Sequence, residues 1–122
     1  MSKILLVEDN EMNRDMLCRR LERKGYDVIV AFDGAQGMSM AQSQSPDLIL
    51  MDIQLPEVSG LDVIRWIKND QSIHDIPIIA VTAFAMKGDE ERIREGGCEA
   101  YLSKPISVGK FIETIRHFLG SA

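Results

Sequence analysis

The sequence lacks the features of several large protein classes. Its longest apolar runs have four or five residues, far fewer than the roughly 20 that a membrane-spanning helix needs. Lys3 precedes only the run Ile4–Val7, which is too short for the core of a signal peptide. The two cysteines, Cys18 and Cys98, do not make a disulfide framework. We therefore expect a cytoplasmic protein with reduced thiols and no membrane span.

An excess of positive charge is also missing. The chain has 14 Lys and Arg residues against 19 Asp and Glu residues, which gives a net charge of −5. An acidic chain repels nucleic acid unless its basic residues cluster, and the sequence shows no such cluster. Direct binding to nucleic acid is therefore not expected.

Linkers, repeats and low-complexity segments are absent from the 122 residues. This length is typical of one domain. At this size, folding buries about two-thirds of the surface of the unfolded chain, which provides a core without metal or disulfide staples. We expect a single domain over residues 1–122, without an output domain, that acts as a monomer.

Short apolar runs recur along the chain and predict strands. These runs are Ile4–Val7, Val28–Ala31, Leu48–Met51, Ile78–Val81 and the weaker Ala100–Leu102. Nearly continuous apolar runs are typical of strands that are buried on both faces of a parallel sheet.

The segments between the runs have helical character, most clearly Ser107–Leu119, where apolar residues recur at helical spacing. Asn10, Ser59 and Ser107 are expected N-caps. Five strands alternating with five helices predict a three-layer, doubly wound α/β fold with right-handed crossovers. The expected strand order is the flavodoxin-like order 2-1-3-4-5.

Polar residues stand where the predicted strands end. Glu8 and Asp9 follow the first run, Asp52 follows the third, Thr82 follows the fourth, and Lys104 comes after the fifth. Because the carboxyl ends of parallel strands meet at one edge of the sheet, these side chains should converge in one crevice. One acidic residue at a strand end is often only a turn or helix cap, but five polar residues at the correct strand ends indicate a site.

Three carboxylates in one crevice repel one another unless one is protonated or a cation lies among them. Oxygen ligands without a nearby histidine or thiolate favour a hard cation, and Mg²⁺ is the natural choice. Carboxylates, Mg²⁺, Lys104 and Thr82 together describe a phosphoryl-transfer site. Asp52 is the candidate nucleophile, which would form an aspartyl phosphate. A cis bond between Lys104 and Pro105 is a further hypothesis, because it would turn the lysine back over the crevice.

The sequence around these residues resembles the receiver domains of two-component response regulators. The resemblance is carried by Val7–Asn10, Leu50–Pro56, Gly60, Val81–Ala83 and Lys104–Pro105, and it extends from Lys3 to Leu119. Two segments, Leu50–Gly60 and Ala83–Lys104, are particularly similar to those of single-domain regulators of cell division. The resemblance implies a phosphoprotein of two-component or phosphorelay signalling that acts in the cell cycle.

By this resemblance, Asp52 is the phosphoacceptor. The resemblance also implies that Glu8, Asp9, Asp52 and the backbone carbonyl of Gln54 hold Mg²⁺. Lys104 is implied to contact the phosphoryl group. Family members carry either Asp or Glu at the position of Glu8, so this residue is compatible with metal binding.

The resemblance further implies a switch. Thr82 is implied to bind a phosphoryl oxygen, and its movement is implied to draw Tyr101 inward. Gln54 and Phe84 flank the site in the family pattern and are implied to tune the lifetime of the phosphoryl group.

The implied phosphodonor is a sensor histidine kinase, a histidine phosphotransfer protein, or both. Family analogy places its contact on Asn13, Met16, Pro105 and Ile106. A receiver domain is not an enzyme with an external substrate, because it catalyses only its own phosphorylation and dephosphorylation.

Alternatives to a phosphorylation-dependent switch stay open from the sequence. A phosphatase of the haloacid dehalogenase type carries the motif Asp-x-Asp at its nucleophile. Here Asp52 stands at the first position of such a motif, but Gln54 stands where the second aspartate would be. A flavodoxin-like binding module would need a phosphate loop where Glu8 and Asp9 stand. Within the receiver class, a phosphorelay shuttle and a binding module that works without phosphorylation are the remaining alternatives.

Overall fold

The computed structural model describes residues 2–83 and 87–120. Five parallel strands form one sheet in the order β2-β1-β3-β4-β5. The strands are β1 (Lys3–Val7), β2 (Asp27–Ala31), β3 (Leu48–Asp52), β4 (Ile78–Thr82) and β5 (Ala100–Ser103). The helices are α1 (Glu11–Arg23), α2 (Gly34–Gln44), α3 (Gly60–Lys68), α4 (Lys87–Glu95) and α5 (Val108–Leu119). The predicted fold class and strand order are confirmed.

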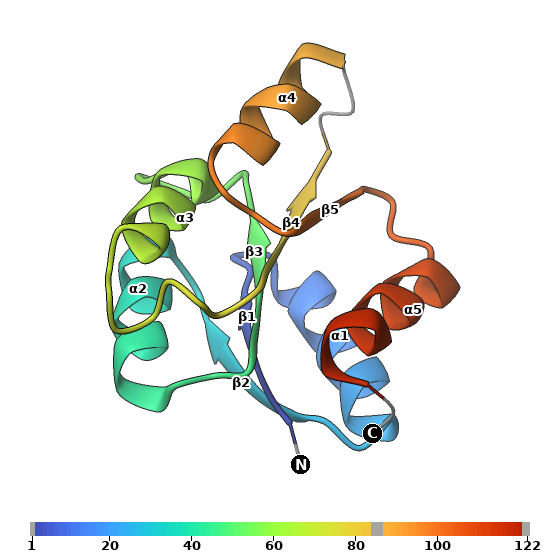
Figure 1. Ribbon diagram of the computed structural model, residues 1–122. Coiled ribbons are helices and arrows are strands. Elements are labelled where there is room, and N and C mark those ends of the chain that lie inside the picture. Colours follow the sequence, from blue (N-terminus) through green and yellow to red (C-terminus); the bar gives the residue numbers. More distant parts are fainter. Residues whose placement is uncertain (1, 84–86, 121–122) are drawn as a thin grey trace.

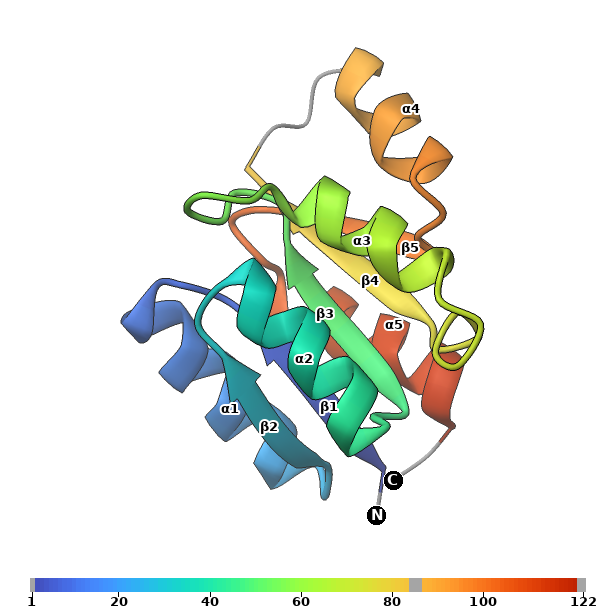
Figure 2. The ribbon, with the colours of Figure 1, turned by 90° about the vertical axis from the view of Figure 1, so that its left-hand side faces the viewer.

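The sheet is the middle of three layers (Figures 1 and 2). Helices α1 and α5 cover one face, and α2, α3 and α4 cover the other. Leu17 of α1 and Phe111 of α5 belong to the buried cluster on the first face, whereas Val63 of α3 and Ile93 of α4 belong to the cluster on the second. Because both faces are covered, the strands carry apolar residues almost without interruption.

Side-chain caps begin the helices that start near the carboxyl edge of the sheet. The Asn10 side chain accepts from the backbone N–H of Asn13 at 2.9 Å, and the Ser59 hydroxyl accepts from that of Leu61 at 3.2 Å. Ser107 occupies the N-cap position of α5 but makes no side-chain cap hydrogen bond. The caps of α1 and α3 therefore also fix the loops that follow β1 and β3.

Gly60 is required where α3 begins against the end of β3. A Cβ atom at this position would lie 2.1 Å from the Asp52 carbonyl oxygen and 2.8 Å from the Ile53 Cα. The Gly60 N–H donates to the Ile53 carbonyl at 3.0 Å. Helix α3 thus contacts the backbone of β3 directly, and this contact fixes the segment that carries Asp52.

The structure also bears on two absences noted in the sequence. Within the described residues, every helix is too short or too polar to cross a bilayer. Cys18 and Cys98 are both free and half-buried.

Candidate functional site

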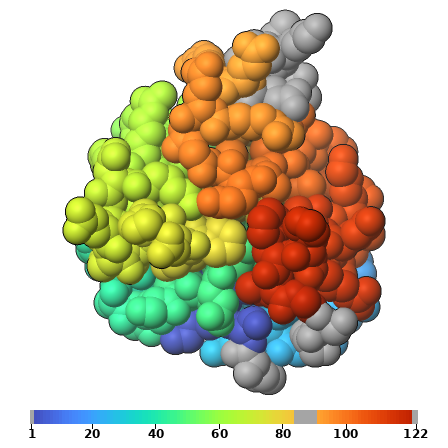
Figure 3. Space-filling model, in the orientation of Figure 1, coloured from blue at the N-terminus to red at the C-terminus, as the bar shows by residue number. Residues whose placement is uncertain are grey.

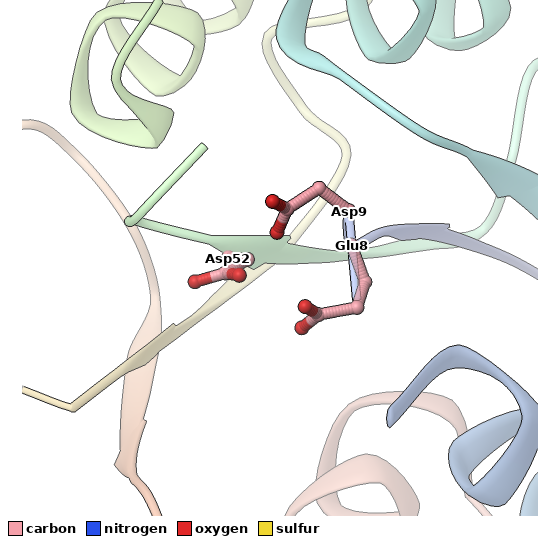
Figure 4. Close-up of side chains that lie close together, drawn as sticks. All are labelled: Glu8, Asp9 and Asp52. Carbon is pink, nitrogen blue, oxygen red and sulfur yellow. The ribbon is translucent and has the colours of Figure 1, made fainter. Parts of the chain in front are cut away.

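Three carboxylates lie together at the carboxyl edge of the sheet (Figure 4). Glu8 and Asp9 follow β1, and Asp52 is the last residue of the neighbouring strand β3. An oxygen from each lies within 4.8 Å of the other two. Glu8 and Asp52 are each only 2% exposed, whereas Asp9 is exposed. Two carboxylates are therefore withdrawn from water in one place and need a compensating charge.

Lys104 supplies positive charge to this cluster. Its Nζ atom lies 3.3 Å from Oδ2 of Asp52 and 3.6 Å from Oε2 of Glu8. Its backbone N–H donates to the Thr82 carbonyl at 2.7 Å, and the peptide bond between Lys104 and Pro105 is cis. The lysine is thus positioned where one ammonium group offsets both buried carboxylates.

The Glu8 carboxyl group is buried next to other negative charge. Burial, followed by the nearby Asp52 carboxylate, raises the pKa of Glu8 to about 7. The backbone N–H of Asn10, which donates to Oε1 at 3.1 Å, and the Lys104 ammonium act in the opposite direction. A divalent cation among these oxygens would relieve the repulsion, and an all-oxygen donor set is the kind that Mg²⁺ accepts. The residues present therefore fit a magnesium ion.

Gln54 connects Asp52 to the loop after β4. Its backbone N–H donates to Oδ1 of Asp52 at 3.0 Å, and its side-chain oxygen accepts from the backbone N–H of Ala83 at 3.2 Å. The metal-binding role of the Gln54 carbonyl stays a prediction. Phe84, the other residue expected to tune phosphoryl lifetime, lies outside the described residues.

Thr82 and Tyr101 lie on the same face of the sheet. Thr82 is fully buried at the end of β4, and Tyr101 is half-buried on β5. In the register of the two strands, Tyr101 pairs with Ala80, two residues before Thr82, and residues two apart in a strand share a face. The Arg94 guanidinium lies 5.4 Å from the centre of the Tyr101 ring. The switch between Thr82 and Tyr101 stays a prediction.

The four residues expected to contact a phosphodonor share one surface beside the carboxylates. They line a cavity of about 200 Å³ between α1 and the loop after β5. Its lining consists of Asn13, Met16, Pro105 and Ile106 together with Glu8, Leu17 and Lys104. The fold thus brings two separate segments of the chain next to the acidic cluster.

Arg14 belongs to the site although the sequence patterns did not point to it. Its Nη1 atom donates to the backbone carbonyls of Glu8 at 3.0 Å and Asp9 at 2.9 Å. Its guanidinium also stacks on the Phe32 ring, 4.4 Å from the ring centre. Side chains in a helix point back toward its N-terminus, so an arginine in the first turns of α1 can reach the end of β1. Arg14 therefore holds the backbone that presents both carboxylates.

Comparison with known proteins identifies the family. The family model described as the response regulator receiver domain matches residues 4–116. The chain belongs to this family. The receiver domain is 59% identical over 119 residues to the polar-differentiation response regulators DivK of Brucella ovis and Brucella anthropi. Each alignment covers 98% of this chain and 97% of the relative.

Solved structures agree with this assignment. The receiver domain of the sensor histidine kinase PA1611 from Pseudomonas aeruginosa PAO1 is 37% identical, with a TM-score of 0.90 and 98% of each chain covered. That structure has a magnesium ion coordinated in its active site cleft. The chemotaxis protein CheY4 of Vibrio cholerae, 24% identical with a TM-score of 0.90 over 97% of this chain and 98% of its own, shares the fold. Membership of this family excludes a phosphatase of the haloacid dehalogenase type and a flavodoxin-like binding module as the identity of this chain.

Proposed function

We propose that this receiver domain is a phosphorylation-dependent switch in two-component or phosphorelay signalling that controls cell division. Asp52 accepts the phosphoryl group from a phosphohistidine of a sensor histidine kinase or a histidine phosphotransfer protein. One observation carries the proposal: Asp52 is 2% exposed at the end of β3, with carboxylates of Glu8 and Asp9 and the ammonium group of Lys104 around it. The similarity to DivK supports the cell-division role.

In the proposed transfer, a carboxylate oxygen of Asp52 attacks the phosphorus atom. A P–O bond to Asp52 forms as the P–N bond to the donor histidine breaks, and the imidazole leaves with the electron pair. Lys104 neutralises charge on the phosphoryl oxygens. Glu8, Asp9, Asp52 and the Gln54 carbonyl would hold Mg²⁺, which supplies further charge neutralisation when bound. Hydrolysis of the acyl phosphate resets the protein, so no external substrate is turned over.

The new group brings about two negative charges to the edge of the sheet. The Thr82 hydroxyl would donate to a phosphoryl oxygen, and Tyr101 on the same sheet face would follow it. This movement would change the surface made by α4, β5 and α5, parts of which appear in orange and red in Figure 3. Partner binding at that surface is the proposed output.

The donor protein would dock on the surface that Asn13, Met16, Pro105 and Ile106 share beside the crevice. We also propose that the protein acts in the cytoplasm. Free thiols at Cys18 and Cys98 are compatible with that reducing compartment.

The test is intact-mass spectrometry after incubation with a small acyl phosphate, with and without Mg²⁺. The wild-type protein should gain one phosphoryl group in the presence of Mg²⁺, and Asp52→Asn should gain none. Asp47→Asn is the matched control, because Asp47 immediately precedes β3 whereas Asp52 ends it. The control variant should be labelled like the wild type.

Two results would contradict the proposal. An adduct that persists in Asp52→Asn would place the modification on another residue. Failure of labelling by both the acyl phosphate and phosphorylated histidine proteins would leave a receiver fold that acts by binding alone.

A further inference from the structure

Phe32 is an aromatic residue that lies outside the hydrophobic core. It follows directly after β2, at the same edge of the sheet as the three carboxylates. Phe32 is 51% exposed and belongs to neither of the two buried clusters of the described residues. A half-exposed ring gains only part of the stabilisation that full burial provides. Packing in the core therefore does not account for the ring, whereas its contact with a cation does.

The backbone on both sides of Phe32 is fixed by hydrogen bonds. The Ala31 carbonyl accepts from the Glu8 N–H at 3.1 Å, which extends the pairing of β1 and β2 as far as the first carboxylate residue. The Phe32 N–H donates to Oε1 of Gln36 at 2.8 Å, and the Asp33 side chain caps α2 by accepting from the Gln36 N–H. The ring is therefore presented by an ordered segment that is attached to the carboxylate site.

The cation that contacts the ring is the Arg14 guanidinium, whose Cζ atom lies 4.4 Å from the ring centre. Helix α1 packs beside β2 (Figure 2), and this packing brings the first turns of α1 next to the residue that follows β2. A cation is attracted to the face of an aromatic ring, and a planar guanidinium also stacks on it. The ring thus restrains the plane and the position of the guanidinium.

The same guanidinium holds the chain where it presents Glu8 and Asp9. Its Nη1 atom donates to the carbonyl oxygens of both residues, at 3.0 and 2.9 Å. Neighbouring side chains in an extended chain point to opposite sides, yet both of these carboxylates lie beside Asp52 (Figure 4). The chain therefore turns at these two residues, and one arginine nitrogen fixes both carbonyls of the turn.

We propose that Phe32 is a positioning residue for the metal site and that it acts through Arg14. This inference rests on the proposed function, because it assumes that Glu8 and Asp9 hold Mg²⁺ for the phosphorylation of Asp52. The ring restrains the arginine, and the arginine restrains the backbone of the two carboxylates. Groups that orient metal ligands without touching the metal change its affinity.

The proposal separates the binding of Mg²⁺ from the chemical step. The contacts of Phe32 and Arg14 described above are with each other and with the backbone before α1, and none of them reaches Asp52. Loss of the ring should therefore lower the affinity for Mg²⁺. The rate of phosphorylation at saturating Mg²⁺ should not change.

The first test is calorimetric titration of the wild type and three variants with Mg²⁺. Phe32→Leu keeps an apolar side chain but removes the aromatic face, and it should weaken Mg²⁺ binding roughly threefold. Phe32→Tyr keeps the face and should bind Mg²⁺ like the wild type. Trp66→Leu is the matched control, because Trp66 is 44% exposed on α3 and no described cation lies over its ring. This control should leave the affinity unchanged.

The second test measures labelling by a small acyl phosphate at increasing Mg²⁺ concentration. Phe32→Leu should need roughly threefold more Mg²⁺ to reach half of its maximal rate, and its maximal rate should equal that of the wild type. The double variant Arg14→Gln/Phe32→Leu should bind Mg²⁺ no more weakly than Arg14→Gln alone, because the ring acts through the arginine.

Equal Mg²⁺ affinities in Phe32→Leu and the wild type would overturn the inference. A similar loss in Phe32→Tyr or in Trp66→Leu would overturn it too, because the effect would not depend on the aromatic face over Arg14. Additive losses in the double variant would show that Phe32 does not act through Arg14. Each of these results leaves the proposed function standing if the wild type is labelled on Asp52. A wild type that neither binds Mg²⁺ nor gains a phosphoryl group would refute the proposed function and this inference together.

Discussion

The carboxylate crevice and a groove between α1 and α5 hold their charges in opposite ways. Arg20, Arg23, Lys24 and Arg116 line this groove, which we call the cationic groove. In the crevice, Glu8 and Asp52 are buried and share the ammonium group of Lys104. In the groove, Arg20 and Arg23 are exposed and have no partner within the described residues. Buried charges interact strongly and need compensation within a few ångströms, whereas exposed charges are screened and act mainly on what approaches.

The contrast indicates which substitutions the protein will tolerate. A change in the crevice alters close packing, protonation and the chemistry of Asp52 together. A change in the groove alters the field that a partner meets and leaves the folded chain almost unaffected. Each of the following experiments compares the two regions or isolates one property of the crevice.

A glycine in each region gives the largest expected contrast. Gly60→Ala places a Cβ 2.1 Å from the Asp52 carbonyl oxygen, and the resulting backbone shift should lower the free energy of unfolding by about 3 kcal/mol. Gly109 lines the groove, and a Cβ added there would meet no atom within 4 Å, so Gly109→Ala should stabilise α5 by roughly 0.5–1 kcal/mol. Urea denaturation measures the free energy of unfolding of both variants. Equal effects at the two positions would show that the crevice is not more tightly packed than the groove.

Removing the cation of the crevice should have the next largest effect. Lys104→Met deletes the charge nearest to Asp52 and Glu8, and it should slow phosphorylation by acyl phosphate roughly 100-fold. Loss of this ammonium group should also raise the pKa of Glu8 further, since Lys104 lowers it in the wild type. The rate is measured by intact-mass spectrometry over time. Arg20→Gln should leave this rate unchanged, and a comparable loss in both variants would argue against a specific role for Lys104.

Glu8 should make stability depend on pH in the absence of divalent cations. Its pKa is raised from 4.5 to about 7 in the folded protein, so between these values the folded state holds a proton that the unfolded state has released. Stability from this group should therefore fall as the pH rises, by on the order of 3 kcal/mol across the window. Denaturation at several pH values should show a smaller decrease for Glu8→Gln. The same slope in both proteins would assign the pH dependence to other groups.

Two arginines of α1 offer the finest comparison. Arg14 donates to the carbonyls of Glu8 and Asp9, whereas Arg20 belongs to the groove. Arg14→Gln should destabilise the protein by about 1 kcal/mol and weaken Mg²⁺ binding roughly tenfold, because the backbone of both carboxylates loses its support. Arg20→Gln should change stability by less than about 0.5 kcal/mol and leave Mg²⁺ binding unaltered. Calorimetric titration with Mg²⁺ measures the affinity of each variant. Equal affinities in the two variants would show that Arg14 does not support the metal-binding residues.

The order of the elements and the place of the crevice could be predicted from the residues alone. Each predicted strand agrees with the structure to within one residue at either end, because strands buried on both faces leave continuous apolar runs. Glu8, Asp9 and Asp52 could be placed together for a related reason, since parallel strands bring their carboxyl ends to one edge. Local sequence contained both signals.

Other properties depend on distant parts of the chain and emerge only when it folds. Arg116 joins Arg23 in the groove because α1 and α5 pack on the same face of the sheet. The pKa of Glu8 is raised because the fold buries its carboxyl group beside Asp52. Burial and the distance between charges are set by packing across the whole domain, so neither can be obtained from the spacing of residues along the sequence.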